Sequence, residues 1–428
     1  MKKNNTFRRA AALMAALSIT VSLAVPAFAD TYYIDYGDIT ITKNEDGSQT
    51  IEQGGEEWTD KAGEETVITT SNTVITTLES DLEGPAAEDS GFGPVVEDNY
   101  QPAAPAQPED AEEPKDADQP EGADQPESTD QPKDADQQES ADQPESADRQ
   151  AQPQQAAPAA APAGSTPVNK KDDGFWGNTI TVINNFADKV LNLTLKDVKI
   201  DVSDTGGDNF EFEDDQRGKA ALSVQGKGNV EIELDGNNEL KSGVQRAGLE
   251  KNTSTSTGTL TLKDDKEAGS GSLNAEGGAL SAGIGACYEE GTKNIIITGG
   301  TVTATGGDGG AGIGGGKGGA AENITITGST VTATGGSALG FGGAGIGGGS
   351  DGRNSDSNGK NITITGSTVT ATGDRGGAGI GGGAGESNRG SGNGNNITIT
   401  GSTVTAISNG CGQRGNGGGA GIGGGCNR

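Results

Sequence analysis

The residues in this sequence that could bind a metal ion are carboxylates that gather shortly after residue 200. Calcium prefers oxygen ligands, and the chain contains no histidine that would add nitrogen ligands. We interpret these carboxylates as a tentative calcium site, and a solvated acidic loop is the simpler alternative for the same composition. The tentative calcium ligands are Asp204, Asp208, Glu211, Glu213, Asp214 and Asp215, with Asp197 and Asp201 nearby.

Arg217 and Arg246 lie near this acidic group and are the candidates for a catalytic base. A polysaccharide lyase needs a basic side chain beside calcium-binding carboxylates. Scattered arginines are more often surface residues, and the absence of histidine excludes Ser-His-Asp triads, Cys-His pairs and histidine-zinc sites. We therefore expect a protein that is not an enzyme, and we keep a polysaccharide lyase as a less favoured alternative.

Three segments with the sequence Thr-Val-Thr-Ala-Thr place a hydroxyl group at every second position. Alternate residues of a strand face the same side, so stacked strands of this kind would form a hydroxyl grid of roughly 7 Å by 4.8 Å. Such a grid could hydrogen-bond a glycan or, as a remote alternative, ice, although threonine is also a common exposed strand residue. The tentative carbohydrate-binding residues are Thr301, Thr303, Thr305, Thr330, Thr332, Thr334, Thr368, Thr370 and Thr372.

The glycine-rich sequence AGIGGG begins at Ala311 and recurs in near-copies. It is not a P-loop, because Ala311 replaces the first glycine of that motif and Gly318 follows Lys317. A calcium-binding nonapeptide repeat would need an aspartate in every turn, and only Asp308 and Asp374 come near, out of frame. We therefore interpret the sequence as a wall and a tight corner of a stacked scaffold. The near-copies begin at Ala282, Ala344, Ala378 and Ala420.

The corner sequence alternates with strand-forming segments that read NITITGSTVTATG. In one copy, Ile324, Ile326, Val331 and Ala333 face one side and the threonines face the other. Rings of such small apolar side chains are stable only when stacked, so the pattern predicts an all-β fold, a right-handed parallel β-helix. The first asparagine of three copies fits an N-glycosylation sequon, but we favour a stacked asparagine ladder at a corner. The copies begin at Asn294, Asn323, Asn361 and Asn396.

The chain divides into four segments by composition. A basic start, an apolar stretch and the cleavage sequence Ala27-Phe28-Ala29 predict an export signal, a secreted protein and a mature chain that begins at Asp30. The acidic segment rich in Pro, Ala and Gln has too few apolar residues to fold, which predicts a disordered, extended linker. The predicted segments are a signal peptide at 1–29, a short β segment (a cap or the first coils) at 30–83, the linker at 84–172, and the β-helix at 173–428, with repeats from 282.

The precursor carries a formal net charge of -32 at pH 7. A polyanion repels nucleic acid and anionic lipid, so we expect neither as a partner, and the apolar stretch in 1–29 is too short for a retained membrane anchor. Cys411 and Cys426 could form a disulfide outside the cell and leave Cys287 free, and three isolated thiols are the alternative. The sequence stops at Arg428 before another NITIT segment, so we expect either a truncated record or completion by another chain.

Four stretches carry a resemblance to a known family: LTLKDVKI at 193–200, VEIELDGNN at 230–238, AGL at 247–249, and the NITITG-TVTATGG repeat. Residues 179–423 resemble the carbohydrate-binding parallel β-helix domains of proteins secreted by anaerobic Gram-positive bacteria. The resemblance implies a non-catalytic relative of pectate lyases that binds plant cell-wall polysaccharide with calcium held by acidic side chains. Residues 33–70 also resemble the segment that opens such domains, which would make the linker an insertion within one fold.

The sequence therefore predicts a secreted, non-catalytic module that binds a polysaccharide or a cell-surface glycan, with calcium as a possible cofactor. The alternative is a structural or adhesive stalk, in which the β-helix holds a partner-binding region away from the cell. Aromatic side chains for stacking on sugars are scarce in the repeats, where the chain has only Tyr288 and Phe341 after Ser270. Hydroxyl rows would therefore have to carry the recognition.

Overall fold

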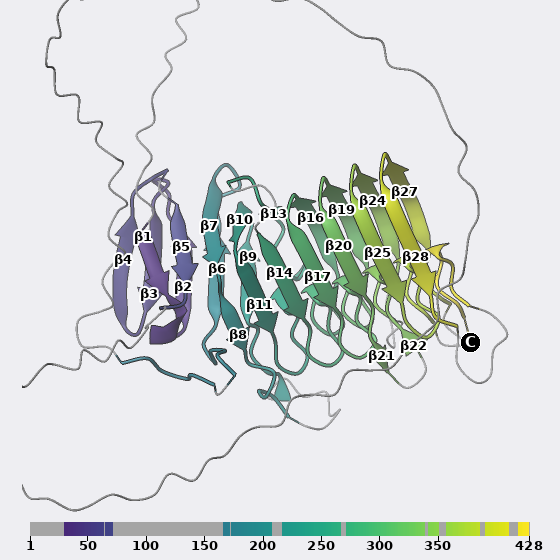
Figure 1. The fold of residues 1–428 in the computed structure, drawn as a ribbon, viewed down its shortest axis with the longest axis horizontal. Helices are drawn as coiled ribbons and strands as arrows, with labels where there is room; N and C mark the ends of the chain where they lie inside the picture. Colours follow the sequence, from purple (N-terminus) through teal and green to yellow (C-terminus); the bar gives the residue numbers. More distant parts are fainter. Residues whose placement is uncertain are drawn as a thin grey trace, which may run out of the picture. The chain divides into compact units, whose positions relative to one another are not determined.

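The computed structural model describes residues 30–63, 65–71, 166–171, 173–207, 216–266, 271–338, 341–350, 357–385, 390–410 and 418–427. In these residues the chain forms three large, mostly parallel sheets and one short 3-10 helix, η1 (Ile34–Tyr36). Strands of successive coils lie side by side in chain order (Figure 1). This is the parallel β-helix that the sequence predicts. The predicted signal peptide and most of the predicted linker lie outside the described residues.

We call the three large sheets A, B and C. Each full coil contributes one strand to sheet B, then one to sheet A, then one to sheet C. Sheet A contains β1 (Asp30–Tyr33), β5 (Thr66–Thr69), β7 (Val190–Lys196), β10 (Asn229–Asp235), β13 (Leu260–Lys263), β16 (Thr292–Thr298), β19 (Ala321–Thr327), β24 (Gly359–Thr365) and β27 (Gly394–Thr400). Sheet C contains β8 (Lys199–Asp201), β11 (Asn237–Lys241), β14 (Ser272–Glu276), β17 (Thr301–Thr305), β20 (Thr330–Thr334), β25 (Thr368–Gly373) and β28 (Thr403–Ser408).

Sheet B begins with β4 (Glu56–Asp60), β3 (Gln49–Gln53), β2 (Ile39–Lys43), β6 (Ile180–Asn184) and β9 (Leu222–Gly226). It continues through the two-residue strands β12 (Leu249–Glu250), β15 (Ile284–Gly285), β18 (Ile313–Gly314), β23 (Ile346–Gly347), β26 (Ile380–Gly381) and β29 (Ile422–Gly423). A separate hairpin, β21 (Ser337–Ala338) and β22 (Phe341–Gly342), lies between sheets C and B in one coil. No helix among the described residues is long and apolar enough to cross a membrane.

The core consists of ladders of identical or similar side chains from successive coils. Ile324 in β19 pairs in register with Ile295 in β16 and with Ile362 in β24, and all three are fully buried. In sheet C, Val331 in β20 pairs with Val302 in β17, and both are buried. Each such side chain contributes roughly 2 kcal/mol when it leaves water. The alternation in the sequence therefore identifies the inward face of the repeats.

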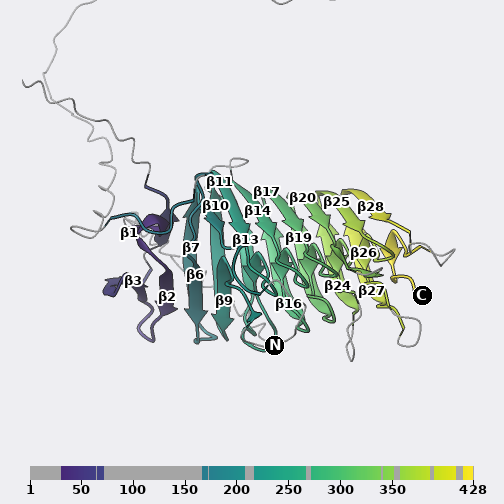
Figure 2. The same ribbon diagram turned by 90° about the horizontal axis from the view of Figure 1, so that it is seen from below.

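The segment before the linker is part of the same stack of sheets (Figure 2). β5 pairs in parallel with β7, and β2 pairs in parallel with β6, although the linker separates the two members of each pair in sequence. The side-chain amide of Asn178 donates a hydrogen bond of 2.8 Å to the carbonyl of Ile34. β3 and β4 then extend sheet B by antiparallel pairing beyond β2. Residues on both sides of the linker therefore build the first coil together.

The AGIGGG sequences supply the short strands of sheet B and the bends next to them. Ile313 pairs with Ile284 and Ile346, so this residue of each copy continues a core ladder. The glycine after it, Gly314, has a φ of 145°, and a Cβ atom there would lie 1.9 Å from the carbonyl oxygen of Gly347. Only glycine fits such a close approach of two backbones. The structure confirms that the sequence forms a wall and a corner.

The asparagines that open the strand segments form a ladder along one corner. Asn294, Asn323, Asn361 and Asn396 have φ values of 58°, 57°, 54° and 54°. The side-chain amide of Asn323 donates to Asn294 Oδ1 at 2.9 Å, Asn361 donates to Asn323 at 3.0 Å, and Asn396 donates to Asn361 at 2.7 Å. The predicted ladder is confirmed. Its bonds join side chain to side chain, except that Asn294 donates to the carbonyl of Thr257 at 3.3 Å.

Candidate functional site

The predicted threonine rows lie on the outer face of sheet C. Thr301, Thr303 and Thr305 of β17 pair in register with Thr330, Thr332 and Thr334 of β20, which pair with Thr368, Thr370 and Thr372 of β25. The valines and alanines between them are buried, so the threonine side chains face outward and are half-buried or exposed. Parallel strands lie about 4.8 Å apart, and alternate residues lie roughly 7 Å apart along a strand. The nine residues therefore form one regular hydroxyl grid, which we call the threonine grid.

Polar residues that the sequence analysis did not select continue the threonine grid at both ends. Ser272 and Asn274 of β14 pair with Thr301 and Thr303, and Thr403 of β28 pairs with Thr368. The hydroxyl of Ser272 donates to Asn237 Oδ1 at 3.2 Å, so the polar surface reaches one coil further. The alternation SLNAE at 272–276 is the sequence signal that could have identified β14 as part of the same face.

A second set of outward threonines lies on sheet A. Thr325 of β19 pairs with Thr363 of β24, which pairs with Thr398 of β27. These side chains are also half-buried or exposed. They have the same chemistry as the threonine grid but lie on a different face of each coil, which makes them a matched control for any function assigned to sheet C.

A cavity of about 310 Å³ also lies on the outer face of sheet A, and the sequence analysis did not predict it. Its charges are largely paired with one another. The ammonium of Lys263 lies 3.0 Å from Glu231 and 3.6 Å from Asp265, and Lys266 pairs with Glu65. The cavity is lined by Gly63, Glu65, Asn192, Leu193, Glu231, Glu233, Lys263, Asp265 and Lys266. The lining therefore has four carboxylates and two lysines, so the cavity is polar with an excess of negative charge.

The predicted calcium ligands fall mostly outside the described residues, which include Asp204 but not Asp208, Glu211, Glu213, Asp214 or Asp215. Asp204 lies 3.0 Å from the ammonium of Lys171, which also lies 3.5 Å from Asp201. Within the described residues, no group of three or more acidic or cysteine side chains is placed to hold a metal ion. Asp204 is therefore paired with the ammonium of Lys171, and we assign no calcium ion to it.

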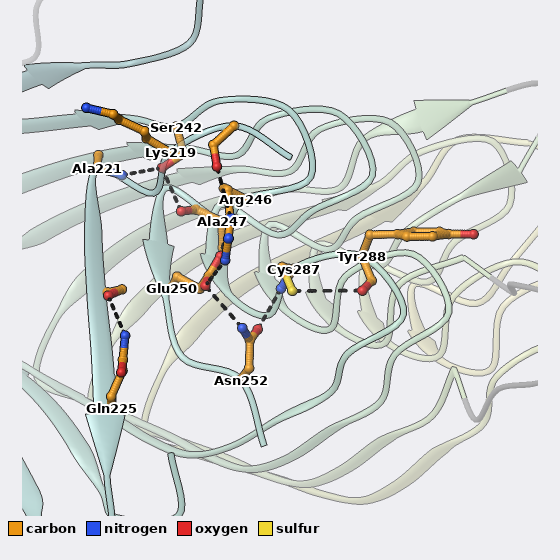
Figure 3. Close-up of polar contacts among 12 residues, drawn as sticks. Lys219, Ala221, Gln225, Ser242, Arg246, Ala247, Glu250, Asn252, Cys287 and Tyr288 are labelled. Carbon is orange, nitrogen blue, oxygen red and sulfur yellow. Dashed lines mark hydrogen bonds and ion pairs between the residues drawn. The ribbon is translucent and has the colours of Figure 1, made fainter. Parts of the chain in front are cut away.

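Arg246 takes part in a buried polar cluster next to β12 (Figure 3). Its Nη1 atom lies 3.0 Å from Glu250 Oε1, and its Nε atom donates to the carbonyl of Gly218 at 3.1 Å. The side-chain amide of Asn252 donates to the same Glu250 oxygen at 3.1 Å, and Asn252 Oδ1 accepts from the backbone N–H of Cys287 at 2.8 Å. Burial raises the pKa of Glu250, and Arg246 opposes this rise. These contacts give Arg246 a structural role, and catalysis stays a prediction.

The cysteines differ from one another in environment. Cys426 is disulfide-bonded, and Cys411, its predicted partner, lies outside the described residues. Cys287 is a free, buried thiol. Burial raises the pKa of Cys287 to about 12, and the Glu250 carboxylate adds to the rise. A thiol that stays protonated at neutral pH is a poor nucleophile, so Cys287 acts as a small core residue.

Among the residues that the structure describes, Lys251 is the largest fully buried side chain, and its ammonium donates to the backbone carbonyl of Lys293 at 2.8 Å. Burial lowers the pKa of Lys251 to about 8, and Lys293 adds to the decrease. In the unfolded chain Lys251 has its ordinary pKa of 10.5, so keeping it charged in the core lowers the free energy of unfolding. This loss of stability has its full size below pH 8 and disappears as the pH rises toward 10.5.

We expect Lys251→Met to raise the free energy of unfolding by about 2 kcal/mol at pH 7, because it removes this buried charge. Urea denaturation of both proteins at pH 7 and pH 10.5 measures the effect, and the advantage of the variant should shrink at the higher pH. An equal advantage at both pH values would contradict a role for the charge.

A family model described as Beta helix repeat matches residues 295–317, 324–350 and 362–384. Each matched stretch runs from sheet A through sheet C to sheet B, so it covers most of one coil. No curated protein and no solved structure matches the chain. The matched repeats and the stacked parallel sheets together define a parallel β-helix protein.

Proposed function

We propose that this protein is a secreted, non-catalytic module that binds polysaccharide on the outer face of sheet C. The observation that carries the proposal is the register of the threonine grid, which continues without a break through β17, β20 and β25. A glycan chain presents hydroxyl groups at regular intervals, and each threonine hydroxyl can both donate and accept a hydrogen bond. The family resemblance and the predicted export signal support the same function.

The composition of the threonine grid favours a neutral glycan. The outward residues of β17, β20 and β25 are threonines, so these strands offer no cation that could pair with a uronate carboxylate. The chain also carries a formal net charge of -32, which repels an acidic polymer. Binding of pectate would therefore require calcium as a bridge, whereas a neutral cell-wall polysaccharide would bind without it.

The experiment compares two triple variants of the secreted chain on a panel of neutral cell-wall glycans and pectate, with and without calcium. Thr303→Val, Thr332→Val and Thr370→Val remove the hydroxyls from the middle column of the threonine grid, and the matched control removes those of Thr325, Thr363 and Thr398. At about 1 kcal/mol for each hydrogen bond, we expect the first variant to lose at least about tenfold in affinity. The control should bind like the unchanged protein.

Two results would count against this proposal. If no glycan on the panel is retained by the unchanged chain, polysaccharide binding is wrong. If both triple variants lose affinity equally, binding does not depend on sheet C. Circular dichroism of both variants excludes unfolding as the cause, because valine and threonine have similar shapes and both favour strands.

The regularity of the threonine grid also favours one second candidate, an ice-binding surface. Ice recognition needs a flat array of hydroxyl and methyl groups with constant spacings in two directions, and the grid has constant register across three coils. Its regularity ends in β28, where Ile407 pairs with Thr372. Thermal hysteresis of the unchanged protein, lost in the sheet C variant and kept in the control, would favour this second function over glycan binding.

A further inference from the structure

The first coil contains a buried carboxylate that has no basic partner among the described residues. Asp60, at the end of β4, is fully buried. One of its oxygens accepts a hydrogen bond of 2.7 Å from the hydroxyl of Tyr32, and the other accepts from the hydroxyl of Thr66. These neutral donors do not balance a full negative charge inside a protein.

We propose that Asp60, together with Asp30, is the binding site for the α-ammonium group that forms when the chain is cleaved between Ala29 and Asp30. Hydrolysis of that peptide bond consumes one water molecule, leaves a carboxylate on Ala29, and gives Asp30 an amine that takes up a proton. The inference rests on the predicted cleavage position and is independent of the glycan-binding proposal.

The strand register brings the new terminus to this carboxylate. Asp30 is the first residue of β1, and it pairs directly with Thr66 of β5, the residue whose hydroxyl donates to Asp60. The carboxylate of Asp30 lies close enough to Asp60 to contribute to the rise in the pKa of Asp60. Each of two neighbouring carboxylates disfavours the negative charge of the other, and a cation close to both would relieve this repulsion. An ammonium group on Asp30 would supply that positive charge at the correct end of β1.

The other polar and charged side chains around Asp60 have different partners. Gln49, which pairs with Asp60 across β3 and β4, donates to Thr66 Oγ1 at 2.6 Å. The ammonium of Lys43 lies 3.5 Å from Gln49 Oε1, so Lys43 contacts Gln49 and not Asp60 itself. Glu65, next to Thr66, pairs with Lys266. No lysine or arginine of the described residues therefore forms an ion pair with Asp60.

The raised pKa of Asp60 is consistent with a buried carboxylate that has no basic partner in the described part of the chain. Burial raises the pKa of Asp60 to about 6, the Asp30 carboxylate adds to the rise, and the hydrogen bonds from Thr66 and Tyr32 oppose it. A carboxyl group whose folded-state pKa is raised destabilises the fold above that pKa, and the cost is relieved as the pH falls. In the processed chain, the α-ammonium group should reverse this effect at neutral pH.

The test compares the chain that begins at Asp30 with a chain that carries Gly-Ser before Asp30, both in buffer with a metal chelator. We expect the chain that begins at Asp30 to melt about 3 °C higher at pH 7. The difference should vanish at low pH, where Asp60 is protonated, and at high pH, where the amine is neutral. The variant Asp60→Asn should remove the difference between the two chains.

A direct titration keeps the inference testable even if Asp60→Asn does not fold. NMR of the selectively labelled α-amino group of Asp30 should give a pKa well above the ordinary value of about 7.7 to 8.0. An ordinary pKa, or equal melting temperatures of the two chains at every pH, would overturn the inference.

Discussion

Replacing Gly347 by alanine is expected to destabilise the repeats by about 4 kcal/mol or more, because the new methyl group has no space. Gly347 lies in β23 with a φ of 138°, and a Cβ atom there would lie 1.9 Å from the carbonyl oxygen of Gly381 in the next coil. The backbone of one coil would have to move away from the other, which would disturb the core ladders on both sides. Thermal and urea denaturation followed by circular dichroism measure the loss.

Gly328 provides the matched control for this substitution. It also has a positive φ, 62°, but apart from Gly328 and its two chain neighbours no residue has an atom within 4 Å of the position of its Cβ. Gly328→Ala should therefore cost only about 1 to 2 kcal/mol, the conformational cost of a left-handed backbone. If the two variants were equally stable, the close packing of the glycine corners in sheet B would be wrong.

Arg246→Met is expected to cost about 3 kcal/mol of folding free energy at pH 7, because it leaves the buried carboxylate of Glu250 without its cation. The pair is 3.0 Å apart, and Glu250 is 7% exposed. Burial already raises the pKa of Glu250, and loss of Arg246 should raise it further. The cost should therefore shrink as the pH falls toward the ordinary pKa of glutamate, because the carboxyl group then becomes neutral.

The double variant Arg246→Met with Glu250→Gln distinguishes charge from packing. Glutamine keeps the shape of Glu250 and can still accept from Asn252, so the double variant should lose less stability than Arg246→Met alone. Urea denaturation of the unchanged protein, the two single variants and the double variant, at pH 7 and pH 4.5, gives the four free energies of unfolding that this comparison needs. A cost for Arg246→Met that does not depend on pH would show that only packing of the arginine stem matters.

The repeated part of the fold could be predicted from the sequence because its contacts are periodic. Ile324 and Ile362 occupy the same place in two copies of one segment, so the alternation within a copy gives the inward face and the repetition gives the neighbour. The same reasoning gives the asparagine ladder and the glycine corners. The choice of residue is most restricted in the repeats, because each residue of a ladder packs against the same residue type in the neighbouring coils.

Contacts outside the repeats could not be predicted in this way. The pairing of β2 with β6 joins segments on opposite sides of the linker, and no periodic pattern relates Ile41 to Val182. The antiparallel strands β3 and β4 likewise depend on tertiary pairing. Lys251, which directly follows β12, is the clearest exception at the level of one residue, because a fully buried position is expected to be apolar.

The candidate site could be predicted in part. The nine selected threonines are brought together in one face by the register of sheet C. Ser272, Asn274 and Thr403 belong to the same face, and they were missed because their strands depart from the repeated text. Arg246 was selected for its charge, and its contacts with Glu250 and Gly218 could not be read from sequence spacing.

The most direct measurement of glycan binding on sheet C is NMR of threonine methyl groups during titration with a neutral cell-wall oligosaccharide. We expect the resonances of Thr303, Thr332 and Thr370 to shift together in a saturable manner. Those of Thr325 and Thr363 on sheet A should stay unchanged. Shifts confined to sheet A, or no shift at a saturating concentration, would contradict the assignment of the binding surface to the threonine grid.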